Sequence, residues 1–173
     1  FIAADFEKGP AAPDSYLGKV VSLLYHRYQS GQLPIAMVSM DNCSHNGDKL
    51  KAGVMAYVDA WKQAGKVDDD FVSYMEEKVS FPWSMIDKIT PRPDEKVKEM
   101  LEKDGFEDTD LIITSRNTYT APFVNSEETG YLVIEDNFPN GRPPLEKAGI
   151  VFTDRETVSL KSKVNDDEWR NML

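Results

Sequence analysis

The sequence predicts an α/β fold in which helices pack against a mostly parallel sheet. Residues 34–40 are apolar on both faces, which is typical of a parallel strand covered on both sides. Segments with helical periodicity precede and follow this strand, and the β–α–β–α order favours a doubly wound sheet. Shorter apolar runs recur beyond residue 110, so we expect a β-rich C-terminal extension of the sheet.

In the N-terminal half, the elements alternate along the chain. Residues 1–6 alternate weakly between apolar and polar side chains and predict a short strand. Apolar residues at helical spacing predict helices over 15–29 and 47–64, on either side of the central strand 34–40. The acidic residues 68–70 open a third helix, because carboxylates in the first turn face the positive end of the helix dipole.

The C-terminal half predicts shorter elements. Residues 79–93 are expected to be extended or irregular, because prolines interrupt them at 82, 91 and 93. The remaining predictions are a helix over 94–103, strands over 111–114 and 131–134, a turn-rich connection over 137–144, a strand over 150–152 and a short helix in the tail 159–173. We expect an α/β domain over 1–125, a strand and loop extension over 126–158 and an unassigned tail over 159–173.

Composition excludes several classes of function. The chain of 173 residues carries 20 Lys and Arg against 30 Asp and Glu, a net charge of -10 that disfavours binding to nucleic acid or anionic membranes. No apolar run approaches the roughly 20 residues that a membrane-spanning helix needs. The single cysteine excludes an internal disulfide and a cysteine-rich zinc site, and we expect a cytoplasmic protein. The two histidines lack metal-ligand spacing, so we expect no metal.

The segment after the central strand is the first candidate site, because ligands of open α/β sheets bind beyond the carboxyl ends of the strands. Residues 39–47 are dense in small polar side chains, and the amide of Asn42 offers both a donor and an acceptor. A turn in which Asn46 caps the next helix is the alternative. Cys43 or His45 as nucleophile or base is a weaker hypothesis.

Two further segments hold charged side chains in apolar surroundings. Asp87 and Lys88 lie within the apolar residues 81–93, so at least one of them is expected to have a specific partner, with a surface salt bridge as the alternative. Glu135 and Asp136 follow a predicted strand and are read either as an acid–base pair or as residues that end the strand and cap a turn.

Together these segments resemble three motifs of the mannitol dehydrogenase family of long-chain polyol dehydrogenases, which includes the fructuronate and tagaturonate reductases. Residues 39–47 resemble its S-x-D-N-x-x-x-N-G motif, and residues 81–91 resemble F-P-x-S-M-V-D-R-I-T-P with Ile and Lys in place of Val and Arg. Residues 133–143 resemble its V-I-E-D-x-F-P-x-G-R-P segment. The order and spacing agree over about residues 5–155.

The resemblance implies a Rossmann-like domain and a zinc-independent oxidoreductase that uses NAD or NADP on a sugar acid or polyol. It implies that Asn42 holds the reacting oxygen, and that Asp87, Asn46 and Lys88 bind substrate or cofactor. The sequence departs from the family in having no G-x-G-x-x-G phosphate loop and no K-x-x-x-x-N-x-x-H motif, whose lysine is the general base. We therefore expect the central portion of such an enzyme, with 1–125 as the second half of its dinucleotide-binding domain and no tightly bound cofactor of its own.

Two other classes of function stay open. A non-catalytic α/β module that binds a small sugar acid or a protein partner fits the missing phosphate loop and lysine. A hydrolase using Asp87 and Glu135 is the third hypothesis, which nothing in their spacing supports. An open sheet edge, left where further strands are missing, is expected to favour self-association.

Overall fold

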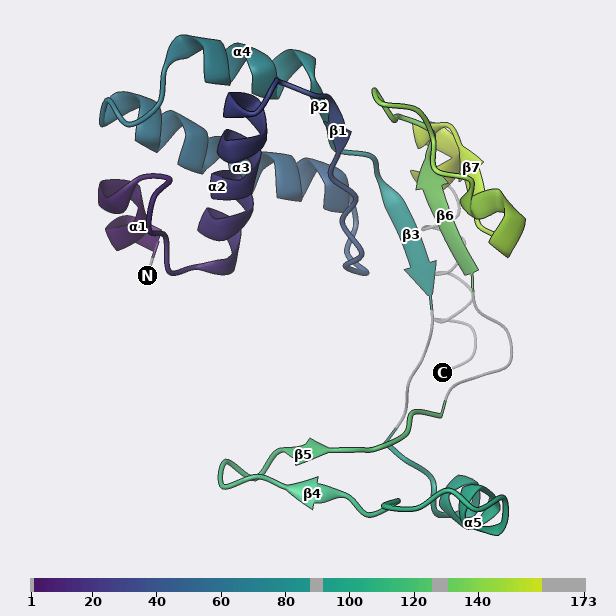
Figure 1. Cartoon of the computed structure of the whole chain (residues 1–173). Coiled ribbons are helices and arrows are strands. Elements are labelled where there is room, and N and C mark those ends of the chain that lie inside the picture. The colour runs from purple at the N-terminus through teal and green to yellow at the C-terminus, as the bar shows by residue number, and fades with distance from the viewer. Residues whose placement is uncertain (1, 88–91, 126–130, 160–173) are drawn as a thin grey trace. The chain divides into compact units, whose positions relative to one another are not determined.

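The structure is a computed structural model that describes residues 2–87, 92–125 and 131–159. The chain falls into two units, one formed by Phe1–Ile86 with Leu132–Leu173 and the other by Asp87–Tyr131 (Figure 1). Helices and both parallel and antiparallel strand pairs are present, which confirms the predicted α/β class. No helix within the described ranges is long and apolar enough to cross a membrane.

Four helices of the first unit lie within residues 2–77. They are α1 (Ile2–Lys8), α2 (Tyr16–Gln29), α3 (Asn46–Gln63) and α4 (Asp69–Glu77). Side-chain caps explain where two of them begin: the Ser15 hydroxyl accepts the Gly18 N–H, and the Asp68 carboxylate accepts the Phe71 N–H. The predicted helices over 15–29 and 47–64, and the helix opened by residues 68–70, are thereby confirmed.

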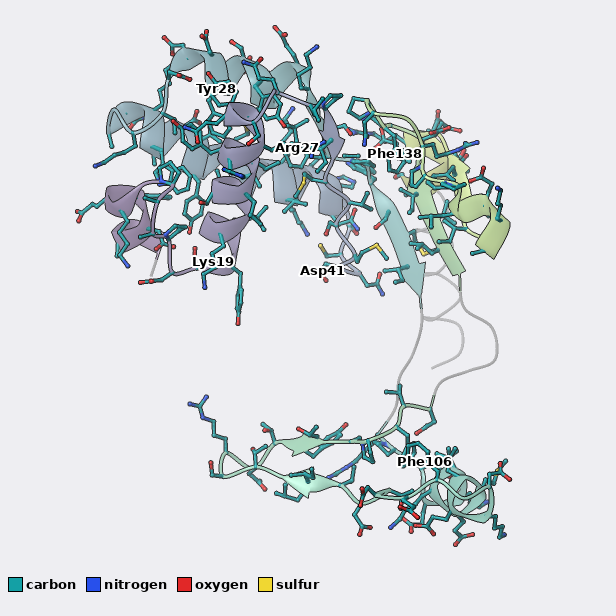
Figure 2. All side chains as sticks on the ribbon, in the orientation of Figure 1. Lys19, Arg27, Tyr28, Asp41, Phe106 and Phe138 are labelled. Atoms are coloured by element: carbon teal, nitrogen blue, oxygen red, sulfur yellow. The ribbon has the colours of Figure 1, made fainter. Side chains whose placement is uncertain are left out.

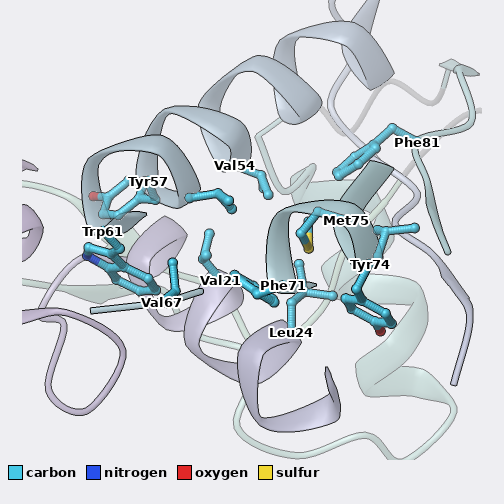
Figure 3. Close-up of a cluster of buried hydrophobic side chains, with 12 residues drawn as sticks. Val21, Leu24, Val54, Tyr57, Trp61, Val67, Phe71, Tyr74, Met75 and Phe81 are labelled. Atoms are coloured by element: carbon cyan, nitrogen blue, oxygen red, sulfur yellow. The ribbon is translucent and has the colours of Figure 1, made fainter. Parts of the chain in front are cut away.

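The hydrophobic core lies where α2, α3 and α4 meet (Figure 3). Its side chains recur at helical spacing, so each helix presents one apolar face to the other two. The fully buried members are Val21 of α2, Val54, Val58 and Trp61 of α3, and Phe71 and Met75 of α4. Burial of each such side chain contributes about 1.5–3 kcal/mol to folding, so this core holds α3 firmly in place.

Short strands accompany the helices. β1 (Ile35–Ala36) pairs in parallel with β2 (Val79–Ser80), with Ile35 opposite Val79. β3 (Ser84–Asp87), β6 (Tyr131–Glu135) and β7 (Val151–Thr153) form a second sheet in the order β3-β6-β7. β6 and β7 are parallel, and the 3-10 helix η1 (Leu145–Ala148) lies in the connection between them.

The second unit consists of α5 (Glu95–Lys103) and a hairpin of β4 (Ile112–Ile113) and β5 (Tyr119–Thr120). The Asp94 side chain caps α5 by accepting the N–H groups of Lys96 and Val97, which confirms the predicted helix over 94–103. The strand predicted over 111–114 is present as β4, and β5 was not foreseen.

Two predicted strands differ from the structure. In the segment 1–6, where a strand was predicted, the described residues 2–6 belong to helix α1. The strand predicted over 34–40 is reduced to β1, which has one partner, β2, among the described residues, so it is not the central strand of the sheet. The Met37 N–H still donates to the Ser80 carbonyl at 2.9 Å, but residues 38–42 have no regular secondary structure.

The remaining predictions fall on short elements. The segment 79–93 contains β2 and β3, and the strands predicted over 131–134 and 150–152 are present as β6 and β7. Residues 155–159 are helical, and residues 160–173 of the predicted tail helix lie outside the described residues. The predicted domain boundaries at 125 and 158 stay predictions.

Helix α1 is held through the buried carboxylate of Asp5. It accepts the backbone N–H groups of Asp14 and Ser15 at 2.7 and 2.8 Å, and these hydrogen bonds lower the pKa of Asp5 from 3.8 to about 2. The Trp61 indole N–H donates to the Asp5 carbonyl at 3.0 Å, which ties α1 to the core. These contacts join groups nine or more positions apart, which the weak alternation in residues 1–6 does not register, so alternation alone predicted a strand.

Asp5 is expected to make folding stability depend on acidity. Its pKa is lower in the folded chain, so its contribution to stability is complete above about pH 4 and is lost as the pH falls toward 2. The Asp5→Asn variant should be less stable than wild type at pH 6 and should lose less stability on acidification. Urea unfolding from pH 6 to pH 2 measures both effects, and Asp59→Asn on the exposed side of α3 is the control. Parallel pH profiles of wild type and Asp5→Asn would contradict this role.

Candidate functional site

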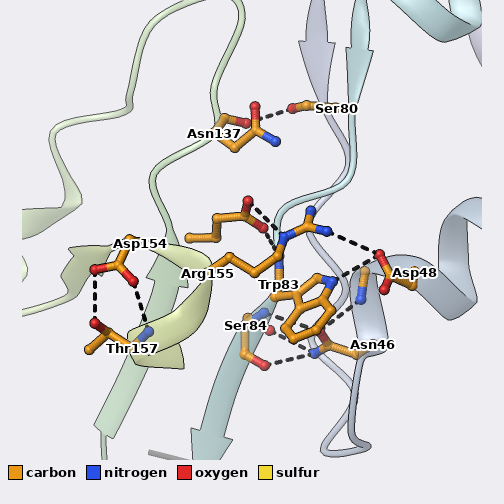
Figure 4. A network of polar contacts seen from close by, with 11 residues as sticks. Asn46, Asp48, Ser80, Trp83, Ser84, Asn137, Asp154, Arg155 and Thr157 are labelled. Atoms are coloured by element: carbon orange, nitrogen blue, oxygen red, sulfur yellow. Dashed lines mark hydrogen bonds and ion pairs between the residues drawn. The ribbon is translucent and has the colours of Figure 1, made fainter. Parts of the chain in front are cut away.

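The three segments with family-like motifs meet around Trp83 and Ser84 (Figure 4). Ser84 contacts Asn46 of the first motif segment, 38 positions away in the sequence. Trp83 contacts Glu135 of the third motif segment, 52 positions away. The structure therefore brings together side chains that the sequence places far apart.

The buried side-chain amide of Asn46 joins the first segment to the second. Its Nδ2 lies 3.0 Å from the Ser84 carbonyl oxygen, 2.9 Å from Ser84 Oγ and 2.9 Å from the Asp41 carbonyl oxygen. Its Oδ1 accepts the N–H groups of Ser84 and Gly47 at 3.0 and 2.8 Å. Only 2% of Asn46 is exposed, so these contacts place it as a residue that holds the loop and β3 together.

Asn46 is the first residue of α3 and does not cap it. The preceding residue, His45, occupies the N-cap position in the left-handed region, with φ 57° and no capping hydrogen bond from its side chain. The expectation that Asn46 caps the helix is therefore wrong. Its amide makes contacts across the structure that a local turn interpretation did not include.

Gly47 is required by the close approach of α3 to the second segment. A Cβ atom at this position would lie 2.4 Å from the Phe81 carbonyl oxygen and 2.8 Å from Trp83 Cδ1. Any side chain would push α3 away from the backbone before β3. The Asn-Gly pair of the first motif thus has a packing explanation for both of its residues.

Glu135 joins the third segment to the second. Its N–H donates to the Trp83 carbonyl at 2.8 Å, and its carboxylate accepts the Trp83 N–H at 2.9 Å and Arg155 Nε at 3.0 Å. Asp136 is paired with Arg142 at 2.8 Å. Each carboxylate of the pair has its own partner, which favours strand-ending and turn contacts over an acid–base pair.

Asn42 lies in the loop between β1 and α3, and its side chain is exposed. Its neighbour Asp41, labelled in Figure 2, is held through its carbonyl oxygen, which accepts the Cys43 N–H at 2.9 Å as well as the Asn46 amide. Asn42 therefore stands between held backbone positions with its amide toward solvent. This arrangement permits a contact with a bound molecule.

The other predicted site residues are placed less completely. Asp87 is the last residue of β3, so it lies three positions beyond Ser84, but its side chain is outside the described part of the structure. Lys88 lies outside the described residues. The convergence of Asn42 and Asp87 on one cleft stays a prediction.

Sequence reasoning missed the contacts that three side chains make with Trp83. The His45 ring stacks on the Trp83 indole, with ring centroids 4.4 Å apart and planes at 18°. Asp48 accepts the Trp83 indole N–H at 3.0 Å, and the Arg155 guanidinium lies 4.8 Å from the ring centroid. Neither His45 nor any other side chain in the described ranges joins a group of three metal-binding residues. No sequence motif marks Arg155.

Comparison with known proteins matches residues 5–147 to the sequence model of the mannitol dehydrogenase Rossmann domain. A D-mannonate oxidoreductase of Thermotoga maritima is 52% identical over 174 residues, which cover 99% of this chain and 32% of that protein. The chain thus spans about a third of the length of this curated relative.

Solved structures show the same likeness. The structure of D-sorbitol dehydrogenase in substrate-free form superposes with a TM-score of 0.69 and 30% identity, over 90% of this chain and 28% of that one. The ternary complex of Pseudomonas fluorescens mannitol 2-dehydrogenase with NAD and D-mannitol gives 0.67 and 27%, over 88% and 27% of the two chains. The predicted Rossmann-like fold is confirmed by these matches.

Gly47 and Gly53, both in α3, provide a matched pair of substitutions. Gly47→Ala should destabilise the chain by about 1–3 kcal/mol, because its Cβ meets backbone that has little freedom to move. Gly53→Ala should be nearly neutral, because its Cβ meets only the flexible end of the Leu17 side chain and alanine favours a helix by about 1 kcal/mol. Urea unfolding of the two variants gives the comparison, and equal stabilities would disprove the close approach at Gly47.

Proposed function

Because this chain belongs to the mannitol dehydrogenase family, we propose that it forms the central part of an oxidoreductase that uses NAD or NADP. The reaction is the interconversion of a secondary alcohol of a sugar acid or sugar alcohol with the corresponding ketone. The observation that supports this most directly is the meeting of the three motif segments at Trp83 and Ser84. A chance likeness of separate sequences would not require their spatial convergence.

A sugar acid is the favoured substrate class. The relative that matches this chain at 52% identity is a D-mannonate oxidoreductase, and the match covers 99% of the chain. Polyol dehydrogenases match at lower identity. We therefore infer a substrate of the D-mannonate type, whose oxidation at a secondary alcohol gives a keto acid. A cytoplasmic location remains a proposal that rests on the single cysteine.

Asn42 is proposed to act on the reacting oxygen. Asn42 is exposed and follows β1, and the carbonyl of the preceding residue, Asp41, is held by the Asn46 amide. An amide N–H aimed at the substrate oxygen stabilises the negative charge that develops there when a ketone is reduced. When bound, the cofactor supplies or accepts the hydride. This chain contributes Asn42 and the hydrogen bonds between Asn46 and Ser84 that fix the Asn42 loop.

The other residues of the candidate site have proposed roles of different kinds. Asn46 serves as a positioning residue, because its amide is used by Ser84, Asp41 and Gly47. Asp87 and Lys88 are proposed to bind substrate or cofactor at the end of β3, as the family motif implies. The sequence has no G-x-G-x-x-G loop, so pyrophosphate binding belongs to another part of the complete enzyme.

Among the described residues β1 pairs only with β2, so its other edge has no strand partner there. Beside it lies an apolar groove of about 460 Å³ between α2 and β1, lined in part by Leu23, Leu33 and Met37. Leu23 and Leu33 are 69% and 60% exposed. When the chain is isolated, we propose that this edge promotes self-association, because unpaired strand edges and apolar patches pair readily.

The role of Asn42 is testable in a hybrid enzyme. This chain replaces the matching segment of the Thermotoga maritima D-mannonate oxidoreductase, and D-mannonate oxidation is followed through NADH absorbance. Asn42→Ala should lower kcat by roughly 100-fold, the usual loss for one donor to a developing oxyanion. Ser44→Ala in the same loop is the control. A kcat within twofold of the unchanged hybrid would remove Asn42 from the proposed mechanism.

The chain alone is expected to lack this activity. Hydride transfer requires the cofactor fixed beside the substrate and a group that exchanges a proton with the reacting oxygen. This sequence lacks both the phosphate loop and the lysine motif that the family uses. The purified chain should not catalyse NADH- or NADPH-dependent reduction of fructuronate, tagaturonate or fructose, and calorimetry should detect weak dinucleotide binding at most. Turnover with any of these substrates would refute the proposal that this chain is only part of the catalytic unit.

A further inference from the structure

Arg155 bridges two carboxylates that come from different parts of the fold (Figure 4). Its Nε donates to Glu135 Oε1 of β6 at 3.0 Å, and its Nη1 lies 3.4 Å from Asp48 Oδ1 of α3. The Glu135 side chain is only 12% exposed, so its charge is poorly solvated without a cation beside it. Arg155 supplies that cation and at the same time neutralises Asp48.

The same guanidinium packs on the ring that contacts the candidate site loop. It lies 4.8 Å from the centroid of Trp83, whose indole stacks on His45 and donates to Asp48. His45 is the residue between the loop and α3, and its left-handed backbone sets the direction in which the loop leaves the helix. Arg155 is therefore linked to the end of the Asn42 loop indirectly, because it packs on the Trp83 ring that stacks on His45.

Arg155 is itself held in place by its neighbours. Asp154 accepts the Thr157 N–H and the Thr157 hydroxyl, both at 2.8 Å, and so caps the helical turn that begins at 155. The cap fixes the backbone that carries the guanidinium. A planar guanidinium can stack on an indole and donate to two carboxylates at once, which an ammonium group does less well.

We propose that Arg155 is a positioning residue for the Asn42 loop. It keeps Trp83 against His45 and keeps the carboxylates of Asp48 and Glu135 close together, which fixes residues 39–45 relative to β3. Asn42 is then presented in one orientation. The inference rests on the proposed function only in the assumption that Asn42 contacts the substrate; the control of loop position by Arg155 stands apart from it.

The structural part is tested on the full 173-residue chain by amide hydrogen exchange. Arg155→Met keeps the length of the side chain but removes its charge and donors. Exchange of the amides in 39–45 should become about tenfold faster, while exchange in 54–61, at the centre of α3, stays unchanged. Lys62→Met is the matched control, because Lys62 is also ion-paired on α3, 2.7 Å from Asp69, but at the far end of the helix. Unchanged exchange in 39–45 would overturn the proposal.

The functional part is tested by a double-mutant cycle in the hybrid enzyme. Arg155→Met should lower kcat about tenfold and leave KM within twofold, because a displaced amide weakens binding of the transition state more than that of the substrate. In the Asn42→Ala background, Arg155→Met should have no further effect on kcat. If the losses multiply instead, Arg155 acts on activity by a route other than Asn42, and the proposal is wrong.

A conservative variant separates charge from shape and protects against failure to fold. Arg155→Lys keeps the charge, so it should recover part of the kcat lost in Arg155→Met, and it decides the cycle if the Met variant does not fold. An unchanged kcat in Asn42→Ala alone would end the proposed function of Asn42. The exchange experiment would still decide whether Arg155 controls the loop.

Discussion

One buried side-chain amide holds the candidate site together. The amide of Asn46 lies among the backbones of the loop before α3, the first turn of α3 and the start of β3, and it contacts all of them. If a buried amide loses such partners, its donors and acceptors are left unpaired, and each unpaired group lowers the stability of the folded chain by about 1–3 kcal/mol. The position of the loop therefore follows from the position of Asn46.

The position of Asn46 in turn follows from the core. Val54, Val58 and Trp61 fix α3 against α2 and α4, and the missing side chain of Gly47 lets the start of α3 approach the backbone of Phe81. Burial of apolar side chains thus fixes the position of α3, and α3 fixes the position of the Asn46 amide. That amide in turn fixes the loop before α3. Because closely packed interiors transmit strain, we expect a change in the packing of the core to shift α3 and, with it, the loop that carries Asn42.

The sequence predicted what is local and missed what is distant. The helix over 16–29 was readable from its apolar spacing and the helix over 69–77 from the acidic residues 68–70, since each signal lies within a few residues of the helix itself. Helix α1 was missed because Asp5 accepts hydrogen bonds from amides nine and ten positions later in the sequence. Arg155 was missed because its partners lie in β6 and α3, and no periodicity connects them.

Asn42 and Asn46 show how burial divides one residue type into two functions. Asn42 lies in the loop before α3 and Asn46 is the first residue of α3, and both carry the same donor and acceptor groups. Asn46 is 2% exposed, and its amide is hydrogen-bonded to the backbone of its own chain. Asn42 is exposed, and the backbone beside it is fixed by Asn46. In the proposed mechanism Asn42 contacts the substrate oxygen. The buried amide of Asn46 supports that contact, because it fixes the Asp41 carbonyl directly before Asn42.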